Sequence, residues 1–239
     1  MHFFGQQCGI SIQQVNGVKV DVIYTVTDMA TDNTMSTDPT PHYLSTRDPW
    51  QSPALAGGSK LEDTVHVTLS AHVTAKSMDC TVIKHPTILD QLFIEEDYRT
   101  DPASVSPEYR RDPVTGVFYN QNGTRAKHGR IPDIGIRNNH TGKMYLIECK
   151  NQKDAGNAHE RAATYATPGI IASIQRKLGV DYHPVGYLFS GPMVTNRKYI
   201  GELRCTYSAT PDHLLLWAPE RPAALLTDWF DRVISPLLM

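Results

Sequence analysis

Residues 131–150, IPDIGIRNNHTGKMYLIECK, contain the pattern on which the fold prediction depends. Two apolar runs, 131–137 and 143–150, flank a polar loop, residues 138–142, whose composition is typical of a hairpin connection. A tight loop pairs residues whose numbers sum to about 281 or 283, which places Asp133 opposite Glu148 or Lys150. The sequence therefore predicts a two-stranded hairpin with polar side chains facing one another across it.

Three of these polar side chains are predicted to converge. Glu148 and Lys150 are two residues apart and project from the same face of the sheet, whereas Cys149 points to the other face. With Asp133 opposite, the Cβ atoms lie roughly 5 Å apart. Two carboxylates at that distance repel each other unless a cation lies between them, and hard oxygen ligands favour Mg²⁺. We predict Mg²⁺, with Mn²⁺ as a substitute, bound by Asp133, Glu148 and the backbone carbonyl of Cys149.

This arrangement suits phosphodiester hydrolysis. The reaction needs a metal to activate water and positive charge on the developing pentacovalent phosphorane. Lys150 is suited to orient the attacking water or to stabilise the transition state, and acting as a base would require its pKa to fall well below ~10. An exposed cluster of acids and lysine is the alternative. However, of the ten lysines only Lys150 has an acid two positions before it, so the catalytic interpretation is preferred.

The same residues resemble a known family. Pro132-Asp133 followed by Glu148-Cys149-Lys150 resembles the PD-(D/E)xK nuclease superfamily, and Gly156-Asn-Ala-His-Glu-Arg161 looks like the Gly-Asn-x-x-Glu-Arg block of the EcoRI and MunI type II restriction endonucleases. The resemblance covers residues 132–161. It implies an α/β fold, a restriction-endonuclease-like mixed β-sheet core flanked by helices. It also implies a homodimer that cuts double-stranded DNA at a short palindrome, with catalytic Asp133, Glu148 and Lys150.

The resemblance also assigns DNA contacts to the residues after Lys150. Asn157 would bond adenine N6 and N7, and Arg161, oriented by Glu160, would donate to adenine N7, which predicts a site with central AATT. A capping box explains Asn157 and Glu160 but leaves Arg161 without a role. The other predicted DNA-binding residues are Ala158, His159, Gln152, Lys153 and Arg130.

The distribution of charge agrees with a DNA partner. Residues 121–161 hold eight Lys/Arg and four Asp/Glu, which leaves 15 basic and 21 acidic residues elsewhere out of totals of 23 and 25. This segment therefore has a net charge of +4, and the remainder has −6. A local basic surface on an acidic body is typical of a protein that binds the phosphate backbone.

The N-terminal third predicts a β-rich addition to that core. Apolar residues alternate with polar ones at 18–26 and again at 65–73, which is typical of half-buried strands. Residues 28–60 between them are rich in Asp, Thr, Ser and Pro, as in a long loop or arm. We predict an N-terminal β-rich extension with a polar loop at 1–80 and the nuclease core at 81–239.

The remaining elements are predicted from periodicity, Pro and Gly. Helices are expected at 87–97, from Asn157 to about Ala166, from Thr167-Pro168 to Gly179, and from Pro222 to about Ile234, with strands at 185–189 and 214–217.

The composition indicates the cellular compartment, and two alternative functions remain. No apolar run is long enough for a membrane span, the N-terminus lacks a signal-peptide pattern, and four widely spaced cysteines suggest neither zinc nor disulfides. We therefore predict a cytoplasmic protein without a membrane partner. Two alternatives stay open: a structure-directed or repair nuclease of the same superfamily, and a catalytically inactive DNA-binding module.

Overall fold

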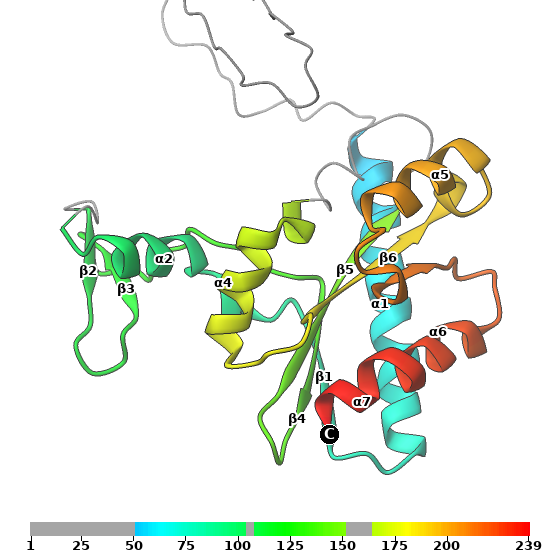
Figure 1. Cartoon of the computed structure of the whole chain (residues 1–239), viewed down its shortest axis with the longest axis horizontal. Coiled ribbons are helices and arrows are strands. Elements are labelled where there is room, and N and C mark those ends of the chain that lie inside the picture. Colours follow the sequence, from blue (N-terminus) through cyan, green and yellow to red (C-terminus); the bar gives the residue numbers. More distant parts are fainter. Residues whose placement is uncertain (1–50, 104–107, 152–163) are drawn as a thin grey trace, which may run out of the picture. The chain divides into compact units, whose positions relative to one another are not determined.

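The predicted hairpin lies at the centre of a mixed sheet (Figure 1). The computed structural model describes residues 51–103, 108–151 and 164–239. Five strands are ordered β1-β4-β5-β6-β7: β1 (Cys80–Lys84), β4 (Ile134–Asn138), β5 (Met144–Asn151), β6 (Val185–Ser190) and β7 (Leu214–Leu216). The pairs β1–β4 and β4–β5 are antiparallel, whereas β5–β6 and β6–β7 are parallel. This sheet, flanked by helices, confirms the predicted α/β core.

The register of the hairpin follows from its turn. Ile134 pairs with Ile147 and Arg137 with Met144, so the numbers of paired residues sum to 281, the first of the two predicted registers. Gly142 has φ of 73°, a backbone conformation that glycine adopts without strain. Because Asp133 immediately precedes the first pair, continuing the register sets it opposite Glu148.

Helices cover both faces of the sheet. One face packs against α1 (Gln51–Ala75), α6 (Ala223–Trp229), the π-helical turn η5 (Phe230–Ile234) and α7 (Ser235–Leu238). The other packs against α2 (Leu92–Thr100), α4 (Pro168–Leu178) and α5 (Arg197–Thr206). Strand β5 is accordingly buried from Met144 to Cys149, as expected for a strand between two helical layers. Short 3-10 helices at Thr87–Leu89, Thr164–Ala166, Gly191–Val194 and Pro211–His213 complete the elements.

The C-terminal half follows its sequence signals closely. Helix α4 has Thr167 as N-cap, Pro168 in the first turn and Gly179 at its C-cap with φ of 65°, which confirms the predicted boundaries. Strands β6 and β7 also form where predicted. The final helix begins after Pro222, as expected, and passes through the π-helical turn before α7.

The strand predicted at 65–73 is wrong, because these residues belong to α1. Val65, Leu69 and Val73 are buried, whereas Val67 is 64% exposed. A segment with alternating apolar residues also has an apolar residue at every fourth position, which is close to the spacing of a helical stripe. Packing against β1, β5 and α6 selects the helix. Residues 51–60, predicted as loop, are helical too. The segment 18–26 lies outside the described residues, and the domain boundary at residue 80 stays a prediction. No helix in the described ranges is long and apolar enough to cross a membrane.

The helix predicted at 87–97 is divided into a 3-10 turn, Thr87–Leu89, and α2. The buried Gln91 between them holds a second, two-stranded sheet, β2 (Tyr109–Arg111) and β3 (Phe118–Asn120). Its amide donates to Phe118 O at 2.6 Å and Ala126 O at 2.7 Å, and its oxygen accepts from Phe118 N at 3.1 Å. One fully satisfied amide thus fixes the small sheet to the start of α2.

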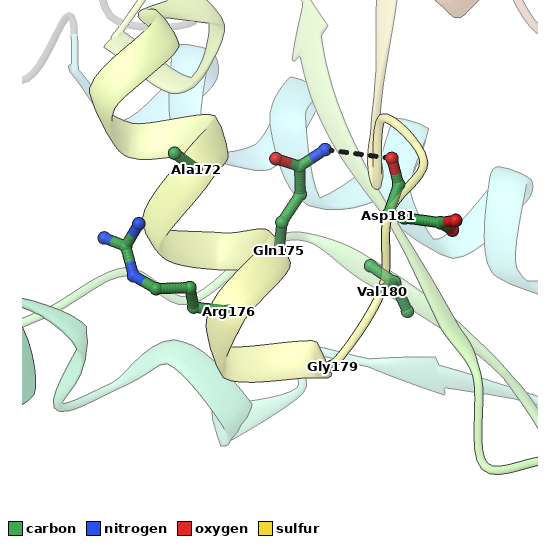
Figure 2. Close-up of a pocket in the computed structure, with 6 residues that line it drawn as sticks. All are labelled: Ala172, Gln175, Arg176, Gly179, Val180 and Asp181. Carbon is green, nitrogen blue, oxygen red and sulfur yellow. Dashed lines mark hydrogen bonds between the residues drawn. The ribbon is translucent and has the colours of Figure 1, made fainter.

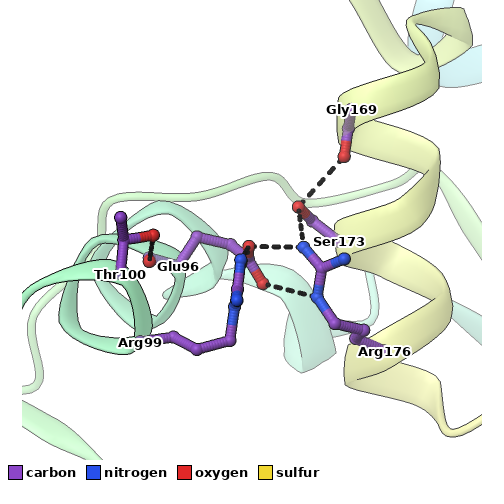
Figure 3. A network of polar contacts seen from close by, with 6 residues as sticks. All are labelled: Glu96, Arg99, Thr100, Gly169, Ser173 and Arg176. Atoms are coloured by element: carbon purple, nitrogen blue, oxygen red, sulfur yellow. Dashed lines mark hydrogen bonds and ion pairs between the residues drawn. The ribbon is translucent and has the colours of Figure 1, made fainter.

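Helices α2 and α4 are joined by surface charges (Figure 3). Glu96 accepts hydrogen bonds from Arg176 at 2.5 Å and from Arg99 at 2.9 Å. The next residue of α4, Lys177, contacts Glu95, which precedes Glu96 in α2. We refer to Glu95, Glu96, Arg99, Arg176 and Lys177 as the α2–α4 ion-pair cluster. Each charge in it has an opposite partner and remains partly in solvent.

Candidate active site

Asp133, Glu148 and Lys150 come together where β5 nears its carboxyl end. Lys150 Nζ contacts Glu148 Oε1 and lies 3.9 Å from Asp133 Oδ2. The backbone N–H of Cys149 donates to Asp133 Oδ2 at 2.6 Å. The Cys149 side chain is buried among residues of the opposite, α1-covered face, so the alternation predicted from the sequence holds. The structure therefore unites the three predicted catalytic side chains on one face.

Burial raises the pKa of both carboxyl groups. Glu148 is only 7% exposed, and burial, reinforced by the charge of Asp133, raises its pKa to about 7. Burial also raises the pKa of Asp133, although Lys150 and the Cys149 N–H oppose the shift. Burial lowers the pKa of Lys150, but Glu148 and Asp133 outweigh it and the net shift is upward. A lysine held in its charged form suits electrostatic stabilisation rather than proton abstraction.

The site contains buried polar atoms that have no hydrogen-bond partner among the described residues. Among the described residues, four buried side-chain nitrogen or oxygen atoms lack a hydrogen-bond partner, and they include Glu148 Oε2, Tyr207 Oη and Arg130 Nε. The ring of Tyr207 lies tilted by 34° against that of Tyr187 with centroids 4.3 Å apart, and Tyr187 of β6 pairs with Glu148 of β5. A buried carboxylate oxygen without a donor is costly unless a cation binds it. Together with the oxygens of Asp133 it forms the hard donor set that Mg²⁺ prefers, so the residues present fit the predicted metal.

Two further residues at this site were missed by the sequence analysis. Glu62 of α1, His85 after β1 and Asp133 each offer a ligand atom, and these atoms lie within 4.8 Å of one another. His85 Nε2 lies 2.9 Å from Glu62 Oε2, and the His85 backbone N–H donates to Asp133 O at 2.9 Å. Glu62 was missed because α1 was predicted as loop and strand. The helical phase of Leu61, Val65 and Leu69 is the signal that places Glu62 beside the buried stripe.

The predicted base-reading residues cannot be placed in this site. Gln152, Lys153, Asn157, Ala158, His159, Glu160 and Arg161 lie outside the described residues. Of the helix predicted from Asn157 to Ala166, the structure describes only the end, a 3-10 turn at Thr164–Ala166. Their roles stay predictions. Arg130 is described, and its guanidinium lies over the rings of Phe93 and Tyr165.

An open pocket of about 650 Å³ lies elsewhere, at the carboxyl end of α4 (Figure 2). Its lining residues are Ala172, Gln175, Arg176, Gly179, Val180 and Asp181. The Gln175 amide crosses toward the following turn and donates to Asp181 O at 3.5 Å and to Tyr182 O at 3.0 Å. This lining has one carboxylate and no nucleophile. Gln175 fixes the turn after α4 and Arg176 pairs with Glu96 of α2, so these groups stabilise the fold rather than serve a reaction.

Comparisons with known proteins agree with this geometry. The family model described as type II restriction enzyme MunI matches residues 40–239. A curated relative, the type II restriction enzyme MunI of Mycoplasma sp, is 28% identical over 123 residues, which are 46% of this chain and 61% of the relative. The aligned part thus spans less than two thirds of that relative. A crystal structure of MunI restriction endonuclease in complex with cognate DNA has a TM-score of 0.52 and 21% identity, and covers 67% of this chain and 83% of that one. At this identity the structural similarity shows the fold.

Proposed function

Because the chain belongs to the MunI family of type II restriction enzymes, we propose that it is a site-specific endonuclease that hydrolyses double-stranded DNA at a short palindrome. The observation that carries the proposal is the convergence of Asp133, Glu148 and Lys150 on one buried face, with Glu148 Oε2 unpartnered by the described protein. A homodimer with one active site per strand would match its own two-fold symmetry to that of the palindrome.

The described side chains have different roles in hydrolysis. Asp133 and Glu148 would hold Mg²⁺, with Mn²⁺ as a substitute and the Cys149 carbonyl as a further ligand. Bound there, the ion would supply Lewis acidity and lower the pKa of a water molecule. Lys150, kept charged by the two carboxylates, orients the attacking water and stabilises negative charge on the phosphate. The Cys149 N–H fixes one oxygen of Asp133.

Glu62 adds a third carboxylate beside Asp133. Its charge contributes to raising the pKa of Asp133, and His85 holds its orientation through the 2.9 Å contact. A third negative charge strengthens the attraction of the site for a divalent cation.

The recognition part of the proposal rests on the Gly156–Arg161 block and its resemblance to the EcoRI and MunI enzymes. Asn157 would bond adenine bidentately, and Glu160 would orient Arg161 toward adenine N7. Gln152, Lys153, Ala158, His159 and Arg130 would contribute further DNA contacts. We propose a recognition site with a central AATT. Fragment ends that map to sites without AATT would remove this assignment and leave the nuclease proposal intact.

Digestion of plasmid DNA tests the proposal directly. We expect discrete fragments with Mg²⁺ or Mn²⁺, none with EDTA, and sequenced ends that define one palindrome. Asp133→Ala protein, purified in the same way, controls for contaminating nucleases. Binding without cleavage under every metal condition would favour the inactive DNA-binding module instead.

Light scattering with and without a DNA duplex tests the dimer. We expect twice the monomer mass for the protein bound to its site, whether or not the free protein is already a dimer. A monomer that nicks only one strand would favour the structure-directed or repair nuclease.

A further inference from the structure

The backbone before Asp133 fixes Arg130 at the edge of the active site. The Arg130 N–H donates to Leu89 O at 2.8 Å, and the Phe93 N–H donates to His128 O at 3.1 Å. A Cβ at Gly129 would lie 2.0 Å from Leu89 O, so only glycine permits this approach. Residues 128–130 therefore run tightly along the segment that leads into α2, which defines where the Arg130 side chain emerges.

The Arg130 guanidinium lies over two aromatic rings, and the described residues place no carboxylate against it. Its Cζ lies 5.6 Å from the ring centroid of Phe93 and 5.3 Å from that of Tyr165, which is cation–π geometry. Its Nε is buried without a hydrogen-bond partner among the described residues. Arg125 behaves differently, because its guanidinium donates to both oxygens of Asp90, at 2.8 and 2.9 Å. Within the described ranges, no acid neutralises Arg130 in this way.

Arg130 is connected to the catalytic carboxylates through Tyr165. The backbone O of Tyr165 accepts a hydrogen bond from Tyr187 Oη at 3.1 Å, and Tyr187 pairs with Glu148 between β6 and β5. Burial raises the pKa of Glu148, and the charge of Arg130 opposes that shift. Tyr165 is thus shared by the guanidinium and the acidic centre. A stacked guanidinium keeps its donors in a planar fork, which matches the oxygens of a phosphate. Positioned beside a cation-binding pair of carboxylates, that fork has the geometry of an anion-binding group.

We propose that Arg130 is a catalytic residue that donates hydrogen bonds to the non-bridging oxygens of the phosphate that is cut. This rests on the proposed function. In the step, a water oxygen forms a bond to phosphorus, the bond from phosphorus to the bridging ester oxygen breaks, the water loses a proton to solvent, and the leaving oxygen gains one. Arg130 remains protonated throughout and stabilises the negative charge that develops on the phosphate.

Single-turnover cleavage at saturating enzyme measures this role. We expect Arg130→Met, which keeps an unbranched stem between the rings, to slow cleavage about 10²–10³-fold, the usual effect of losing one oxyanion donor. Arg130→Lys should restore part of the rate. The matched control is Arg176→Met, which removes the same charge from the α2–α4 ion-pair cluster, where the side chain of Arg176 is 45% exposed. The control should cut within about twofold of wild type, as expected for an exposed charge. Melting curves verify that each variant is folded, and Arg130→Lys carries both measurements if Arg130→Met does not fold.

A binding cycle gives a readout that does not depend on cleavage. DNA with a neutral methylphosphonate at the mapped cut position is bound in Ca²⁺ by wild type and Arg130→Met. We expect the methylphosphonate to weaken DNA binding by the wild-type protein about tenfold. It should weaken binding by Arg130→Met much less, since that variant already lacks the charge-assisted contact.

Additive effects of the two changes, or single-turnover cleavage by Arg130→Met within about threefold of wild type, would overturn the role of Arg130 and leave the nuclease proposal standing. Failure of the wild-type protein to cut DNA would overturn both.

Discussion

Two clusters in this chain both combine carboxylates with basic side chains, and the pKa values of one glutamate in each shift in opposite directions. In the α2–α4 ion-pair cluster, burial raises the pKa of Glu96, but hydrogen bonds from Arg176 and Arg99 outweigh it and the net shift is downward. In the active site, burial dominates and the pKa of Glu148 rises to about 7 despite the contact with Lys150. The side chain of Glu96 is 24% exposed, whereas that of Glu148 is 9% exposed.

The contrast shows what distinguishes a reactive cluster from a stabilising one. Charges in the α2–α4 ion-pair cluster are paired and hydrated, so their contacts are complete within the protein. In the active site, two buried carboxylates share one lysine and leave Glu148 Oε2 without a described partner. Such incomplete compensation costs stability and is a mark of sites that bind a charged ligand.

Loss of cleavage gives the largest expected difference between the clusters. Asp133→Ala, Glu148→Ala and Lys150→Ala should each reduce DNA cleavage by at least about 10³-fold, since each removes a metal ligand or the charge beside it. The matched changes Glu96→Gln and Arg176→Met should leave the rate unchanged. Cleavage time courses at equal enzyme and Mg²⁺ concentrations make the comparison. Wild-type rates for a folded Glu148→Ala protein would move the active site elsewhere.

The pH dependence of stability should have opposite signs in the two clusters. Without a bound metal ion, burial raises the pKa of Glu148 to about 7 in the folded protein, against an ordinary value of 4.5, so the experiment is done in EDTA. A raised folded pKa stabilises fully below the unfolded value, and that stability is lost as the pH rises toward 7. Glu148→Gln should therefore be more stable than wild type at pH 8, by on the order of 1–3 kcal/mol, since one unit of pKa corresponds to about 1.4 kcal/mol, with the difference shrinking toward pH 5. Urea denaturation across pH 5–8 measures this.

The control is Glu96→Gln, measured by the same urea denaturation across pH 5–8. The lowered pKa of Glu96 stabilises the wild-type protein at neutral pH, and that contribution is lost only as the pH falls through the folded pKa. A Glu148→Gln variant that is less stable than wild type at pH 8 would show that burial is compensated in the active site as well.

The smallest effect is expected from the surface charges themselves. Arg176→Met should lower the free energy of unfolding by less than about 1 kcal/mol, because exposed ion pairs are weak. The loss should vanish in about 1 M salt, where the screening length is only ~3 Å. Denaturant titrations at low and high salt check both statements. A salt-independent loss above about 2 kcal/mol would mean that α2 and α4 depend on this contact as strongly as a buried pair.

The sequence by itself determined the features that depend on neighbouring residues. The loop at 138–142 and the alternation of β5 limited the hairpin to two registers, both of which bring Asp133, Glu148 and Lys150 together, and the structure adopts the first. Pro168 and Gly179 likewise set the ends of α4. These elements were predictable because strand periodicity, turn geometry and helix capping act within a few residues of the chain.

The tertiary structure alone decided which period the segment 65–73 follows. Its apolar residues satisfy a strand and a helix equally well, and burial of Leu61, Val65 and Leu69 against the sheet selects the helix. That choice brings Glu62 to His85 and Asp133. The ring contacts of Arg130 with Phe93 and Tyr165 are equally non-local. Local sequence patterns do not predict such contacts. The free energy of these contacts comes from apolar surface and charge that segments distant in the sequence remove from water together.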